Sequence, residues 1–127
     1  LLMPPWVASY IGRRFDPERF HCWALVATVL RDQFGVAVPD FAIHADDQAT
    51  VERTIRDHRL TWMQVDDPRP GDVALLRVRG YESHVGLIVA PDTMLHVMAR
   101  SDACLQRLDG LEWARRWVGT WRHLELA

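Results

Sequence analysis

Apolar and polar positions along the chain change their spacing near its middle. In the first half, Trp23, Val26, Leu30 and Phe34 recur three or four residues apart, which predicts an amphipathic helix over residues 20–34. In the second half, short apolar runs alternate with turn residues, as is typical of strands. Because helices come before strands without alternating with them, we expect an α+β fold with helices packed on one side of an antiparallel sheet.

Two further helical segments are expected in the first half. A short helix begins at residues 4–5, which are both proline, and ends at Gly12, since proline suits a first helical turn and glycine a C-terminal cap. Asp46 or Asp47 can cap another helix that continues to about His58.

The sheet is expected to be a meander of strands joined by tight turns. Residues 91–92 (Pro-Asp) and 100–102 (Arg-Ser-Asp) separate the later apolar runs, as hairpin turns do. Residues 111–117 fit either a helical turn or a strand. The expected strands cover residues 73–78, 85–89, 94–98, 104–108 and 118–126.

Length and charge limit the class of protein. A chain of 127 residues, 49% of them hydrophobic, fits one globular domain over residues 1–127 that needs no disulfide or metal to form its core. A net charge of -2 with dispersed arginines predicts no nucleic-acid partner. No apolar run approaches the ~20 residues of a membrane span, and residues 1–6 lack the features of a secretory signal. We therefore expect synthesis in a bacterial cytoplasm without a signal peptide.

Cys22 stands where the first long helix is expected to begin. Exposed N–H groups at a helix N-terminus lower the pKa of a thiol, and the same groups can stabilise the oxyanion that forms when a thiolate attacks a carbonyl. The competing interpretation is a small, buried hydrophobic residue. Cys104 has apolar neighbours and is expected to be an inert core residue, and both cysteines are expected to be free thiols.

Two histidines can complete an acyl-transfer site. His84 opens the apolar run at 85–89 and can act as a general base if its strand packs beside the helix start, although it also fits a solvent-facing strand end. His96, between apolar neighbours, can orient His84 or be a core histidine with satisfied hydrogen bonds.

The turn between these two histidines tests the triad. A regular two-residue turn at 91–92 would place His96 opposite Leu87 and on the other face of the sheet from His84. A triad therefore predicts an irregular hairpin between Val89 and Met94.

Five sequence blocks stand in order along about residues 10–108. They are Phe20-His21-Cys22-Trp23-Ala24-Leu25-Val26, Phe34-Gly35-Val36 followed by Pro39, Pro70-Gly71-Asp72-Val73, His84-Val85-Gly86-Leu87-Ile88-Val89, and Leu95-His96. In this order they resemble the NlpC-type papain-like cell-wall peptidases. The resemblance implies a papain-like cysteine endopeptidase that needs no cofactor and cuts the peptidoglycan stem peptide between D-glutamate and the diamino acid. It implies that Cys22 is the nucleophile, His84 the base and His96 the residue that orients the base.

The block around Cys22 is most similar to a subgroup encoded by tailed phages. This implies a virion tail-tip component with other tail proteins as partners, acting in the periplasm or cell wall. Many relatives carry Asp before the cysteine and Ser-Gly after it, where this chain has His21 and Trp23-Ala24. Phe15 stands where many carry a tyrosine that binds the oxyanion, and Tyr10 is a candidate to replace it.

Three other interpretations stay open. The domain can be a structural part of a tail tip that keeps the fold without cleaving. The same centre can instead catalyse deamidation or another acyl transfer, since fold alone does not fix function. His21, Cys22, His84 and His96 are ligand types that suit zinc, but no paired spacing such as CxxC supports a metal site, so none is expected.

Overall fold

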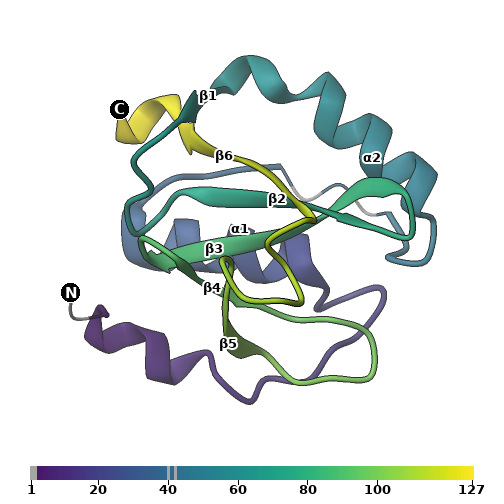
Figure 1. Cartoon of the computed structure of the whole chain (residues 1–127), viewed down its shortest axis with the longest axis horizontal. Coiled ribbons are helices and arrows are strands. Elements are labelled where there is room, and N and C mark those ends of the chain that lie inside the picture. Colours follow the sequence, from purple (N-terminus) through teal and green to yellow (C-terminus); the bar gives the residue numbers. More distant parts are fainter. Residues whose placement is uncertain (1–2, 40, 42) are drawn as a thin grey trace.

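The computed structural model describes residues 3–39, 41 and 43–127. Leu1, Leu2, Asp40 and Ala42 lie outside the described residues, and so does part of residues 1–6, on which the expectation about a signal peptide depends. The elements run along the chain as η1 (Pro5–Ser9), α1 (Cys22–Phe34), α2 (Gln48–Asp57), η2 (Arg59–Thr61), β1 (Trp62–Val65), β2 (Val73–Val78), β3 (Tyr81–Ala90), β4 (Thr93–His96), β5 (Cys104–Arg107), β6 (Trp117–His123) and η3 (Leu124–Leu126) (Figure 1). Within the described ranges, no helix combines the length and the apolar character needed to cross a membrane.

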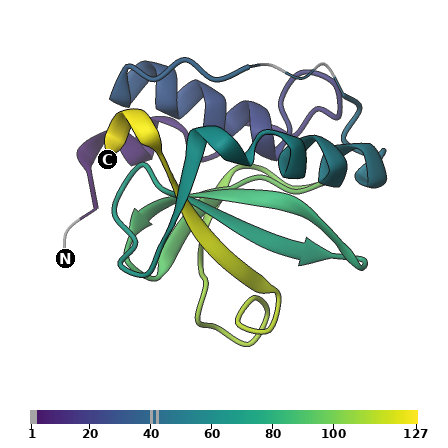
Figure 2. The same cartoon turned by 90° about the horizontal axis from the view of Figure 1, so that it is seen from above.

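The strands form one sheet in the order β1-β6-β2-β3-β4-β5, and every neighbouring pair is antiparallel. Both α-helices lie on the same side of this sheet (Figure 2). The predicted α+β class, with helices packed against an antiparallel sheet, is confirmed.

The two faces of the sheet bury separate apolar clusters. On the helix face, Leu25 and Val29 of α1 pack with Leu87 and Val89 of β3. On the opposite face, Ile88 of β3 belongs to a smaller cluster with Ala74, Leu76, Met94, Leu108 and Trp113. This division follows from the alternation of side chains along a strand, which sends successive residues of β3 to opposite faces.

Local capping explains where the helices begin and end. The His21 side chain accepts a hydrogen bond from the N–H of Ala24, and Gly35 ends α1 in the left-handed conformation at φ 67°. The predicted helix over 20–34 is correct except that it begins at Cys22, because Phe20 pairs with Asp16 in an isolated bridge. Asp47 caps α2 as one of the two predicted alternatives.

The expectation of a simple meander is wrong at both ends of the second half. β1, which the sequence pattern did not predict, is an edge strand, and β6 lies between β1 and β2. β6 ends at His123 and is followed by η3, so the strand expected over 118–126 is shorter than predicted. Residues 111–116 form turns rather than a strand. These differences depend on pairing between segments far apart in sequence, which local periodicity does not report.

The predicted irregular hairpin is confirmed. Leu87 pairs with Leu95 and Ile88 with Met94, and the register then shifts by one residue before Ala90 pairs with Thr93. Continuing the first register places His96 opposite Gly86. His96 therefore shares a face with His84, because residues two apart on a strand point the same way.

Candidate functional site

Cys22 is the first residue of α1, and its thiol lies against β3. The thiol Sγ–H donates to the carbonyl oxygen of Ser83 at 4.0 Å, and the sulfur lies near enough to the backbone N–H of Val85 for that group to lower the thiol pKa. Ser83 and Val85 flank His84 in the chain, so the thiol lies beside the backbone of His84. The apolar residues of α1 hold this arrangement by packing on the helix face of β3.

Burial decides the protonation of Cys22. Although the residue as a whole is half-buried, desolvation raises the pKa of its thiol above the ordinary 9.0, and N–H groups of Val85, Trp23 and Cys22 itself offset only part of that effect. The expectation that the helix N-terminus lowers this pKa toward neutrality is therefore wrong for the free protein. Loss of water around the thiolate outweighs the helix-terminal N–H groups.

The two predicted histidines meet directly. Nε2 of His84 lies 2.8 Å from Nδ1 of His96, and both residues are buried on the sheet face opposite α1. The alternative in which His84 is a solvent-facing strand end is wrong, because the residue is only 7% exposed. The one-residue shift in the hairpin makes this contact possible.

Both imidazoles are neutral at ordinary pH. Burial, with a smaller contribution from the neighbouring His96, lowers the pKa of His84 to about 3. Burial also lowers the pKa of His96, against opposing effects from its hydrogen bond to Gln106 and from the charge of Glu112. A neutral imidazole can accept a proton, so the pair has the protonation state that a general base requires.

Sequence reasoning missed the residues that surround the second imidazole. Nε2 of His96 lies 2.6 Å from Oε1 of Gln106 on β5. Trp113, in the turns between β5 and β6, stacks on His84 with ring centroids 5.5 Å apart and meets His96 edge to face at 5.4 Å. The one signal in the sequence is a neutral polar residue within a strand-like run, which exposed strand positions share.

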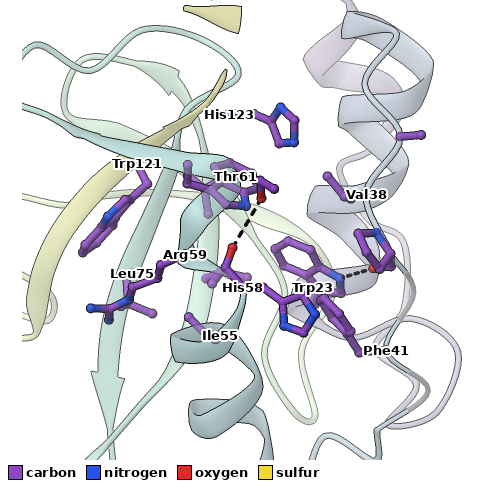
Figure 3. A pocket seen from close by; sticks show the side chains of 15 residues that line it. Trp23, Val38, Phe41, Ile55, His58, Arg59, Thr61, Leu75, Trp121 and His123 are labelled. Atoms are coloured by element: carbon purple, nitrogen blue, oxygen red, sulfur yellow. Dashed lines mark hydrogen bonds between the residues drawn. The ribbon is translucent and has the colours of Figure 1, made fainter. Parts of the chain in front are cut away.

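Two adjoining pockets lie beside the start of α1. The smaller, of about 50 Å³, is lined by Cys22, His21, Ser83 and mainly apolar side chains. The larger, of about 190 Å³, is bordered by three tryptophans, two histidines and several aliphatic residues (Figure 3). Trp23 and Phe41 border both, and the indole N–H of Trp23 donates to the Pro39 carbonyl at 2.9 Å. The described residues that line these pockets do not include His84.

The structure thus brings the three predicted residues near one another but does not connect all of them by hydrogen bonds. His84 and His96 share a hydrogen bond, and Cys22 lies beside the His84 backbone. Among the described residues, no hydrogen bond links the Cys22 thiol to the His84 ring. Such contacts often form only when substrate binds, so the catalytic roles of the three residues stay a prediction.

Tyr10 does not replace the missing oxyanion tyrosine. Its hydroxyl donates to Asp32 at 3.3 Å and accepts from Gln33 at 3.1 Å, near the C-terminal end of α1. Ten residues of helix separate Asp32 from Cys22, which is ~15 Å at 1.5 Å per residue. Backbone N–H groups at the start of α1 are therefore the candidate oxyanion donors.

The second cysteine and the possible zinc site can also be placed. Cys104 is half-buried on β5 rather than fully in the core, and both cysteines are free thiols as expected. In the part of the chain that the structure describes, no group of three or more His, Cys, Asp or Glu side chains is arranged to hold a metal ion. The direct hydrogen bond between His84 and His96 leaves those two ring nitrogens facing each other.

Comparisons with known proteins agree with the fold and the sequence blocks. No curated protein matches the chain. A solved structure from Staphylococcus aureus subsp. aureus Mu50, described as similar to lipoprotein of the NLP/P60 family, superposes with a TM-score of 0.62 at 17% identity. The match covers 92% of this chain and 38% of the staphylococcal chain, so it supports the fold alone. The model of the NlpC/P60 family matches residues 9–122, and the chain therefore belongs to the NlpC/P60 family.

Proposed function

We propose that the chain is a cysteine hydrolase that cleaves the peptidoglycan stem peptide between D-glutamate and the diamino acid. Membership of the NlpC/P60 family supports a cell-wall peptidase activity. The observation that carries the proposal is the 2.8 Å hydrogen bond between neutral His84 and His96, beside the strand backbone that Cys22 contacts. In the proposed assignment Cys22 is the nucleophile, His84 the base and His96 the residue that orients it.

The pKa directions fit a mechanism that starts from neutral partners. The raised pKa of Cys22 and the lowered pKa of His84 favour a thiol beside an imidazole over a thiolate beside an imidazolium. When an amide carbonyl reaches the sulfur, His84 accepts the thiol proton and the thiolate attacks the carbonyl carbon. N–H groups of Cys22 and Trp23 stabilise the oxyanion. His84 then protonates the leaving amine, and water hydrolyses the thioester.

Mass spectrometry of purified peptidoglycan fragments tests this function. Incubation with the chain should produce new peptide termini that identify the bond, and Cys22→Ala and His84→Ala should abolish them. Cys104→Ala and His44→Ala are matched controls on half-buried and exposed residues outside the site, and both should retain cleavage. Cleavage that survives Cys22→Ala, or no cleavage by the folded chain across several wall chemistries, would contradict the proposal.

The proposed place of action is the tail tip of a phage, in contact with the periplasm or cell wall of a bacterial host. The residues around Cys22, from Phe20 to Trp23, support it through their similarity to the phage-encoded subgroup. Purified tails should contain the chain when their proteins are identified by mass spectrometry. Its absence from intact tails would exclude this location while leaving the hydrolase proposal unchanged.

One observation favours a second function, in which the chain is a non-cleaving structural component of a tail tip. Burial of the Cys22 thiol raises its pKa, whereas a nucleophilic cysteine is usually activated by a lowered one. Intact tails that assemble normally with Cys22→Ala and keep full infectivity would favour this structural function. Loss of infectivity with normal assembly would favour the enzyme.

A further inference from the structure

The side-chain amide of Gln106 has one possible orientation. The indole N–H of Trp113 can only donate, and it lies 2.9 Å from Oε1 of Gln106. The carboxylate of Glu112 can only accept, and it lies 3.1 Å from Nε2 of the same amide. These two neighbours assign the oxygen and the nitrogen of Gln106 independently of each other.

The orientation of Gln106 fixes the proton on His96. Oε1 of Gln106 accepts hydrogen bonds, and Nε2 of His96 lies 2.6 Å from it. Nε2 must therefore carry the proton, because two lone pairs at this separation would repel each other. Since burial keeps His96 neutral, its Nδ1 then holds a lone pair.

The proton on His96 in turn fixes the proton on His84. Nδ1 of His96 accepts, so Nε2 of His84 must donate across the 2.8 Å contact. Neutral His84 then has its lone pair on Nδ1. In the described part of the chain no buried side-chain nitrogen or oxygen lacks a hydrogen-bond partner. Nδ1 of His84 has no such partner among the described residues, so it must reach the solvent.

Trp113 also helps to fix the two imidazoles, because its ring contacts both of them beside their hydrogen bond. Its indole is nearly parallel to His84, with 18° between the planes, and nearly perpendicular to His96, at 89°. The same residue therefore orients Gln106 through its N–H and holds the planes of both imidazoles through its ring. Trp113 itself is 1% exposed, so water is excluded from that side of the histidine pair.

We propose that Gln106 is a positioning residue that sets the tautomer of His96 and thereby makes Nδ1 of His84 the nitrogen that accepts the thiol proton. This proposal rests on the proposed function, because it assigns the base nitrogen within the same site. Glu112 and Trp113 act one step further away by orienting Gln106. Metal-ligating histidines have comparable hydrogen-bond partners on their second ring nitrogen, and loss of those partners typically lowers activity about 10–100-fold.

Nuclear magnetic resonance of the full chain labelled with ¹⁵N-histidine tests the proposal without substrate. In the unaltered protein, both His84 and His96 should be protonated at Nε2 and unprotonated at Nδ1. Gln106→Met should give His96 a mixture of tautomers. Gln106→Glu combined with Glu112→Gln exchanges the two groups, so residue 106 still accepts from His96 and from residue 112, and this double variant should retain the Nε2 proton. Gln33→Met is the matched control, since this glutamine bonds to the Tyr10 hydroxyl far from the histidines, and it should change neither tautomer.

Kinetics on the cleaved fragment supply the second measurement. Gln106→Met should lower kcat about 10–100-fold with KM unchanged, and Gln106→Glu combined with Glu112→Gln should recover part of the loss. A proton on Nδ1 of His96 in the unaltered protein, or unchanged tautomers in folded Gln106→Met, would overturn the proposal. If Gln106→Met does not fold, the tautomers of the unaltered chain and of the double variant Gln106→Glu with Glu112→Gln still decide.

The two proposals fail separately. The expected tautomers without any peptidoglycan cleavage would contradict the hydrolase and leave the positioning role intact. Cleavage that needs Cys22 and His84 but is indifferent to Gln106 would contradict only the positioning role.

Discussion

Two buried polar clusters in the same sheet differ in their charge and in their hydrogen bonds. Arg122 of β6 and Asp72, just before β2, form a bidentate ion pair with both contacts at 2.8 Å, and the two residues are 4% and 1% exposed. Asp72 also accepts from the N–H of Arg69, and Arg122 donates to the carbonyl of Asp67. His84 and His96 form a neutral pair that Gln106 closes at one end only.

This difference indicates a structural role for the ion pair and a chemical role for the imidazole pair. In the ion pair, both carboxylate oxygens of Asp72 and the Nε and Nη2 groups of Arg122 are hydrogen-bonded to protein, so the pair fixes where the turn before β2 meets β6. The imidazole pair ends in a lone pair on Nδ1 of His84, which is free to take a proton. A buried pair with a lowered pKa and a nitrogen that can still accept a proton is the better candidate for catalysis.

The largest effect is expected from breaking the ion pair. Asp72→Asn leaves the Arg122 cation buried without its partner, so the free energy of unfolding should fall by about 3–5 kcal/mol in chemical denaturation. Asp109→Asn removes an exposed partner of Arg107 and should leave stability nearly unchanged. Equal losses in the two variants would show that burial of the Asp72–Arg122 pair is not what matters.

Acid should destabilise the fold through the imidazole pair. Arg122 in the ion pair keeps its charge, because its hydrogen bonds to Asp72 raise its pKa. Unfolded chain binds a proton at His84 below the ordinary pKa of 6.5, whereas the folded protein does so only near pH 3. Stability that is present above pH 6.5 is therefore lost as the pH falls toward 3. Denaturation from about pH 8 to about pH 5 should show a loss of about 2 kcal/mol from this residue.

His84→Gln should flatten this pH dependence, and His44→Gln, at an exposed position, should not. Parallel stability profiles for the unaltered chain and His84→Gln would contradict the lowered pKa of His84.

The rate of Cys22 alkylation distinguishes a neutral thiol–imidazole pair from a thiolate–imidazolium pair. A thiol with a raised pKa beside a neutral imidazole should react with iodoacetamide roughly tenfold faster for each pH unit from about pH 7 to pH 9, without a plateau. Peptide mass spectrometry measures Cys22 and Cys104 separately in one sample. A plateau at or below neutral pH would instead indicate a preformed thiolate–imidazolium pair.

The smallest effect is expected at Gln106, which bonds to His96 and to the indole of Trp113. Trp113→Phe keeps an aromatic ring but removes the N–H that bonds to Gln106, which should cost about 1 kcal/mol of stability. Trp117→Phe is the matched variant, since its indole donates to Thr120 at 3.1 Å. A measurable loss in Trp117→Phe with none in Trp113→Phe would show that the indole does not hold Gln106.

The sequence singled out three residues of the candidate site but did not predict its electrostatics. Cys22, His84 and His96 stand out because a cysteine at a helix start and histidines at strand positions have recognisable neighbours along the chain. A triad of these residues also required an irregular hairpin between Val89 and Met94, and the register shift between Ile88 and Ala90 confirms that hairpin. It gave the wrong direction for the pKa of Cys22, because burial depends on how α1 packs on β3.

Local signals alone determined the α+β class, the end of α1 and the start of α2, since the apolar period, the left-handed Gly35 and the Asp47 cap act within a few residues. Only the tertiary structure decided that β6 lies between β1 and β2 and that Gln106 and Trp113 enclose the histidine pair. Strand order and the surroundings of a buried ring depend on contacts between distant segments, and neither leaves a periodic trace in the sequence.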